Sequence, residues 1–181
     1  MKLLLNRGAD IEASTKGMTA LEPALHYKHK EAVELLLKNC AKVTNKYVSN
    51  DVLLWGTKNG YEELVQQLLK RTADGIDPNH KDLYDRTPLS WAAEMGHEKL
   101  VRLLIRHGAQ VESKDKHGQT PLFYAAGNID GTIVTLLIAE GAQVETRDNY
   151  GRTALSRAEA HGRKVVVQVL AQNSHGKNML A

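Results

Sequence analysis

Residues 115–147 read DKHGQTPLFYAAGNIDGTIVTLLIAEGAQVETR, and closely similar stretches begin at positions 82 and 148. A Thr-Pro-Leu or Thr-Ala-Leu step starts at Thr87, Thr120 and Thr153, so it returns every 33 residues. The step Gly-Ala-Gln-Val-Glu recurs with the same spacing, at Gly108 and Gly141. A fixed period of this length is typical of arrays in which one small structural unit is repeated along the chain.

Each unit carries signals for two helices. Thr followed by Pro starts a helix, because the hydroxyl accepts a bond from a free backbone N–H and Pro needs no partner at the first position. Leu and Val at three- and four-residue spacing then give a second helix one apolar face. Gly108 and Gly141 stand where that helix would end in a left-handed cap. A unit this small cannot bury its own apolar face, so it must stack on its neighbours.

The repeat weakens toward the N-terminus, where Thr19-Ala20-Leu21 and Asp51-Val52-Leu53 take the place of the helix start. Cys40 and Thr72 replace the capping Gly, at a cost of about 1 kcal/mol each, so we expect the N-terminal half to be the less stable one. We predict a single array over residues 1–181. Its units are a partial repeat at 1–13, repeats at 14–45, 82–114 and 115–147, a divergent repeat with an elongated hairpin at 46–81, and a C-terminal repeat at 148–181.

From Asp115 to Ala142 the order Asp-x-x-Gly-x-Thr-Pro-Leu and then Gly-Ala closely resembles the ankyrin repeat family, in the style of the arrays of fungal ankyrin-repeat proteins. The resemblance also runs from Thr87 through Gly96-His97 to Gly108-Ala109. It implies an all-α solenoid of helix-turn-helix units joined by β-hairpin-like loops, as one partial and five full repeats. The family's His after Thr-Pro-Leu is absent, so we expect its hydrogen bond to the Thr turn to be missing throughout. The residues in its place are Glu22, Leu54, Ser90, Phe123 and Ser156.

Composition excludes several classes of protein. Of the 181 residues 42% are hydrophobic and 25% charged, the balance of a folded chain. The net charge of +3 is too small to favour nucleic acid or an anionic membrane, and no apolar run reaches the roughly 20 residues that span a bilayer. One cysteine allows no internal disulfide and fits a reducing compartment. We therefore expect an intracellular protein, cytoplasmic or nuclear.

Candidate catalytic and metal-binding groups are isolated from one another in the sequence. His26 and His29 could share a helix face as zinc ligands do, but no third and fourth ligands are spaced to join them. The acidic stretch 74–85 could hold calcium, but it lacks the closing Glu of a calcium loop, and we favour an elongated hairpin. Cys40 has no recognisable catalytic partner. We predict no enzyme, no cofactor, no metal site and no small-molecule substrate.

The resemblance implies a protein partner, bound along the concave face by hairpin tips and the edges of the first helices. We place the centre at Leu83, Tyr84, Arg86 and Met95, because aromatic residues and Arg most often carry interface energy. The alternative that Leu83 and Tyr84 pack within their own hairpin stays open. Trp91 and Tyr124 are interpreted as stacking residues between units. The candidate contact residues are Tyr47, Lys58, Asn59, Leu83, Tyr84, Arg86, Glu94, Met95, Lys116, His117, Gln119, Asn128, Asn149, Tyr150, Arg152 and His161.

Three functions are compatible with this pattern. The first is a protein-interaction scaffold, and the second is the recognition or regulatory part of a larger multidomain signalling receptor or enzyme. The pattern is incomplete at both ends, which predicts an excerpt of a longer array and leaves self-association through uncapped ends open. The third, an autonomous enzyme or nucleic-acid binder, would need a convergent polar pocket or a continuous basic strip. Neither is visible in the sequence.

Overall fold

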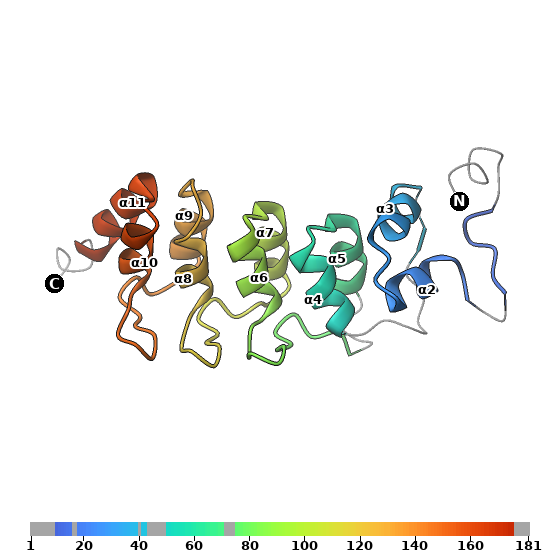
Figure 1. Ribbon diagram of the computed structural model, residues 1–181, viewed down its shortest axis with the longest axis horizontal. Helices are drawn as coiled ribbons and strands as arrows, with labels where there is room; N and C mark the ends of the chain where they lie inside the picture. Colours follow the sequence, from blue (N-terminus) through green and yellow to red (C-terminus); the bar gives the residue numbers. More distant parts are fainter. Residues whose placement is uncertain (1–9, 16–17, 40, 43–49, 71–74, 176–181) are drawn as a thin grey trace.

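The computed structural model describes residues 10–15, 18–39, 41–42, 50–70 and 75–175 (Figure 1). Within these ranges the chain forms helices and loops, with a single antiparallel bridge between Thr15 and Met18. The all-α solenoid expected from the sequence is confirmed. The helices are α2 (Leu21–His26), α3 (Lys30–Lys38), α4 (Asn50–Lys58), α5 (Glu62–Leu69), α6 (Pro88–Met95), α7 (Glu98–Arg106), α8 (Pro121–Ala125), α9 (Thr132–Ala139), α10 (Ala154–Ala160) and α11 (Lys164–His175).

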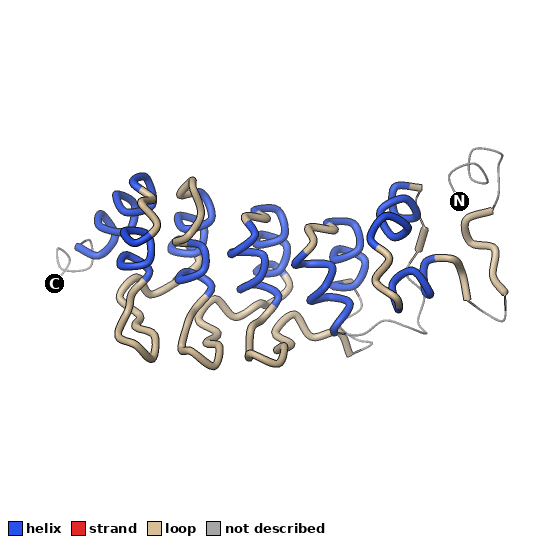
Figure 2. Tube along the Cα trace, viewed as in Figure 1, coloured by secondary structure: helices blue, strands red, loops and turns tan. Residues whose placement is uncertain are grey.

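The helices form two rows. The first helices of successive pairs pack together from α4 through α6 and α8 to α10, and the second helices pack from α5 through α7 and α9 to α11. The α2–α3 pair is in looser contact with the α4–α5 pair than later pairs are with each other. The loops that precede α6, α8 and α10 all project from the same edge of the row (Figure 2).

The helix starts follow the threonine pattern. The hydroxyl oxygens of Thr87, Thr120 and Thr153 each accept a hydrogen bond from the backbone N–H three residues later, at 3.3 Å. Pro is the first residue of α6 and of α8. At the other end, Gly108 and Gly141 have φ of 87° and 95°, which confirms the expected left-handed caps after α7 and α9. Cys40 and Thr72 lie outside the described residues.

The predicted loss of the hydrogen bond to the Thr turn is wrong for three units. The Ser156 hydroxyl accepts from the Thr153 N–H at 3.0 Å, and the Ser90 hydroxyl lies 3.2 Å from the Thr87 hydroxyl. The Glu22 carboxylate accepts from both the N–H and the hydroxyl of Thr19. A hydroxyl or carboxylate three residues after Thr can occupy the space next to the turn, so the bond survives the change of residue type.

One hydrophobic core runs through the array between the two rows. Small residues let the first helices approach closely, since Ala92 and Ala93 of α6 and Ala125 of α8 are completely buried. Leucine and valine of the second helices fill the remaining space. Fully buried examples are Leu64, Val65, Leu68, Val101, Leu104, Val134, Leu137, Val166 and Leu170. The apolar faces are therefore covered by stacking, as the repeat pattern predicts.

Candidate protein-binding surface

Three hairpins, residues 81–86, 114–119 and 147–152, are built on aspartates that recur every 33 residues. In each hairpin one carboxylate oxygen accepts two backbone N–H groups, from the residues two and four positions later, at 2.8–3.0 Å. The aspartates are Asp82, Asp115 and Asp148. These short-range bonds satisfy backbone donors that no sheet or helix would satisfy, so they fix the shape of each loop.

The second carboxylate oxygen of each aspartate points into the array. Asp82 accepts from the Trp91 indole N–H at 2.9 Å, and Asp115 accepts from the Tyr124 hydroxyl at 2.6 Å. Asp148 accepts from the Arg152 guanidinium at 2.9 Å. The negative charge of each aspartate is therefore stabilised by hydrogen bonds from other groups of the protein.

Neighbouring hairpins are joined by backbone hydrogen bonds. The Lys116 N–H donates to the Tyr84 carbonyl at 3.0 Å, and the Asn149 N–H donates to the His117 carbonyl at 2.9 Å. The Asn149 side chain adds a bond to the Lys116 carbonyl at 3.0 Å. The three hairpins thus form one continuous strip, called the hairpin edge below.

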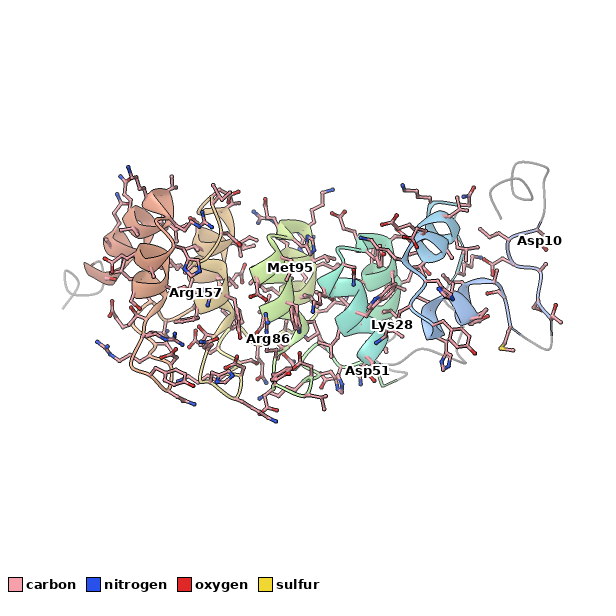
Figure 3. All side chains as sticks on the ribbon, viewed as in Figure 1. Asp10, Lys28, Asp51, Arg86, Met95 and Arg157 are labelled. Atoms are coloured by element: carbon pink, nitrogen blue, oxygen red, sulfur yellow. The ribbon has the colours of Figure 1, made fainter. Side chains whose placement is uncertain are left out.

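Behind the hairpin edge, cations and aromatic rings alternate along the first helices. The Arg86 guanidinium carbon lies 3.5 Å from the centre of the Trp91 ring and 3.9 Å from that of Tyr124. Arg86 also pairs with Glu94 at 2.6 Å, and Arg157 approaches the same carboxylate to 3.9 Å. Burial and the hydrogen bond to Asp115 raise the pKa of Tyr124. Figure 3 shows Arg86 at the hairpin end of α6. Arg157 belongs to α10 and its guanidinium lies near the Phe123 and Tyr124 rings of α8.

The predicted contact residues fall into three groups by exposure. Half-buried are Asn59, Glu94 and Asn128, buried are Arg86 and Gln119, and Tyr47 lies outside the described residues. The exposed residues are Lys58, Leu83, Tyr84, Met95, Lys116, His117, Asn149, Tyr150, Arg152 and His161.

Arg86 and Gln119 differ from the exposed tips that the sequence predicts. Arg86 is 9% exposed between two rings, and the Gln119 side chain donates to Asp148 across the hairpins at 3.4 Å. The Asn128 side chain likewise donates to the Ala93 carbonyl at 2.8 Å, linking α6 to the turn after α8. These polar groups join neighbouring units, because a buried polar group needs an internal partner.

Large apolar side chains are exposed on the same edge. Leu83 is 86% exposed and Tyr84 62%, so the alternative that they pack within their own hairpin is wrong. Tyr150 is 67% exposed and its ring lies 6.3 Å from that of His117. Met95 is 42% exposed at the C-terminal end of α6, away from the hairpin edge. Trp91 and Tyr124 do stack between units, through the Arg86 guanidinium that lies between them.

Sequence reasoning missed a periodic basic position. Lys81, Lys114 and Arg147 immediately precede the three hairpin aspartates, and all three are exposed. Their 33-residue spacing was the signal that could have found them, but adjacent aspartates cancel them in a count of charges. The structure separates the two charges by turning only the aspartates inward.

An open groove of about 990 Å³ lies between α3 and α5, at the loosely packed junction. Leu37 and Tyr61 form its apolar lining, with Glu34, Glu62 and Lys38 also among its residues. Burial, with Glu34 and Glu31 nearby, raises the pKa of Tyr61 to about 12. Within the described ranges, no three His, Cys, Asp or Glu residues gather as metal ligands would.

The fold and its hairpins match a known family. The family model for ankyrin repeats in three copies matches residues 53–148 and 113–180, and the chain belongs to the ankyrin-repeat family. An ankyrin repeat protein of fowlpox virus (strain NVSL) is 50% identical over 26% of this chain and 7% of its own length. The transient receptor potential cation channel subfamily V member 5 of Oryctolagus cuniculus is 33% identical over 61% of this chain and 18% of its own. An ankyrin repeat and KH domain-containing protein of Caenorhabditis briggsae is 35% identical over 61% of this chain and 4% of its own.

The chain therefore spans less than a fifth of the length of each of these relatives. In the part of the chain that the structure describes, every helix is too short or too polar to cross a bilayer.

Proposed function

We propose that the array is a non-enzymatic scaffold that binds a protein partner along its concave face, through the hairpin edge and the first helices. The observation that carries the proposal is the exposure of Leu83, Tyr84 and Tyr150 on one hydrogen-bonded edge. Apolar side chains exposed together mark interaction sites. A fixed edge also loses little conformational entropy when a partner binds. The single cysteine fits a reducing compartment, so the proposal includes an intracellular location.

A second candidate places the same mechanism in a larger protein. The matched relatives are more than five times as long as the part that this chain covers. The array would then be the recognition or regulatory part of a multidomain protein, and its binding face would be the same. The two candidates differ in what the bound partner controls.

Affinity capture from a lysate of the source organism tests the binding face. The bait is the wild-type chain, a Tyr84→Ala/Met95→Ala variant, or a control Ile129→Ala/Val165→Ala variant. The control removes two exposed apolar side chains away from the hairpin edge, 78% and 55% exposed in the wild type. We expect the wild type and the control to retain a common set of proteins. The Tyr84→Ala/Met95→Ala variant should bind these proteins at least about tenfold more weakly. If the Tyr84→Ala/Met95→Ala variant retained the same proteins as the wild type, the assigned binding face would be refuted.

A further inference from the structure

The hairpin edge is basic as well as apolar. Across residues 81–86, 114–119 and 147–152, every exposed charged side chain is a cation. The only acid besides the inward-facing aspartates is Asp85, which is half-buried. The exposed cations are Lys81, Lys114, Lys116 and Arg147; Arg152 is also exposed but pairs with Asp148 at 2.7 Å.

Two of these cations are held in place along the edge. The Lys81 ammonium donates to the Lys114 carbonyl of the next hairpin at 3.2 Å, and the Arg147 guanidinium donates to the Gly151 carbonyl at 2.8 Å. Each bond uses one of several donors, so most of the cation's donors still face outward. Successive units repeat about every 10 Å, which places one such cation at each step.

We propose that the partner segment bound at this edge is an acidic, extended stretch of protein. In an extended polyproline II chain three residues complete one turn and span about 9 Å, so carboxylates at every third position share one side and would each meet one cation per repeat. Apolar side chains between the carboxylates would contact Leu83, Tyr84 and Tyr150, which are exposed among the cations. This inference rests on the proposed function and adds the chemistry of the partner.

A protein segment fits this edge better than a nucleic acid. Leu83, with 86% of its surface exposed, offers an aliphatic contact that a sugar-phosphate chain does not use. The whole chain carries a net charge of only +3, whereas nucleic-acid affinity depends on many cations that neutralise phosphates. Apolar contacts beside regularly spaced cations favour a peptide that carries both apolar and acidic side chains.

Selection from a phage-displayed library of random peptides, about twelve residues long, tests the proposal. The library is selected against the wild-type chain, against Lys114→Gln/Lys116→Gln/Arg147→Gln, and against Lys99→Gln/Arg102→Gln/Arg106→Gln. The last variant removes three exposed cations from α7 and so matches the loss of charge. Affinities of selected peptides are then measured by fluorescence anisotropy at low and high salt.

We expect wild type and the α7 variant to enrich Asp and Glu together with Leu or aromatic residues. The selected peptides should bind the hairpin variant at least about tenfold more weakly, and high salt should weaken wild-type binding. The proposal of an acidic partner would be overturned if the Lys114→Gln/Lys116→Gln/Arg147→Gln variant enriched Asp and Glu as strongly as the wild type. It would also be overturned if the wild type enriched neither residue.

A Leu83→Ser/Tyr84→Ser variant separates failure of this inference from failure of the proposed function. Peptides that depend on Leu83 and Tyr84 but not on the cations leave the binding face standing and refute its acidic specificity. Peptides that depend on neither refute both. A mixed-sequence single-stranded RNA that binds the wild type more tightly than any selected peptide would replace the protein segment with nucleic acid.

Discussion

At the scale of single residues, Asp85 occupies a turn position that suits glycine. Its φ is 61°, and the equivalent residues of the next two hairpins, Gly118 and Gly151, both have a φ of 75°. A Cβ makes the left-handed region costly for most residues. We predict that Asp85→Gly stabilises the protein by about 0.5–1 kcal/mol in urea unfolding.

The reverse change in the next hairpin is the matched control. A Cβ added at Gly118 would lie 2.5 Å from the Asn149 side-chain oxygen, in addition to its positive φ. Gly118→Ala should therefore destabilise the protein by more than about 1 kcal/mol. Equal effects of the two changes would contradict this account of the hairpin turns.

The ionisation of Asp148 makes the stability of the folded protein depend on pH in the acid range. Burial would raise its pKa, but hydrogen bonds from the Arg152 side chain, the N–H groups of Arg152 and Tyr150, and Gln119 lower it from 3.8 to about 2. Because the folded pKa lies below the unfolded one, the stabilisation is complete above pH 4 or so and is lost as pH falls toward 2. We predict that wild type loses roughly 2 kcal/mol more than Asp148→Asn between about pH 5 and pH 2. Parallel stability curves for the two proteins would refute the assignment.

At the scale of elements, Arg86 links α6 to α8. Its planar guanidinium lies between the rings of Trp91 and Tyr124 and also pairs with Glu94. A lysine keeps the charge but cannot stack flat between two rings. We predict that Arg86→Lys costs about 1–2 kcal/mol in chemical denaturation. The exposed Arg102→Lys should change stability by less than about 0.5 kcal/mol, and a similar cost for both would argue against a role for the stack.

At the scale of the whole molecule, packing is uneven along the array. The α6 and α8 helices pack against neighbours on both sides, whereas the α2–α3 pair contacts the α4–α5 pair loosely. Repeat arrays can open unit by unit, because each unit depends only on its neighbours. We predict that amide hydrogen exchange is fastest in α2 and α3 and slowest in α6 and α8. Equal protection along the row would show that the junction is as stable as the centre.

The array and its helix starts could be predicted from the sequence because their signals are local. A Thr-Pro step, a Gly at a helix end and a spacing of 33 residues act through neighbours within a few positions. The exposure of Leu83 and Tyr84 could not be decided this way, since it depends on whether the hairpin folds back on itself. The Glu22, Ser90 and Ser156 bonds were missed because a family pattern names one residue type, while the turn accepts any suitable acceptor.

By itself, the sequence determined that this chain is a stacked array of ankyrin repeats and where most of its helices begin. Only the tertiary structure decided which charges reach solvent. Asp115 and Lys114 are adjacent, yet Asp115 binds Tyr124 inside the array and Lys114 lies exposed on the hairpin edge. Arg86 is buried because rings from two different repeats meet on either side of it. Burial and pairing depend on partners in other repeats, more than 33 residues away in the sequence, so the character of the hairpin edge follows from the fold.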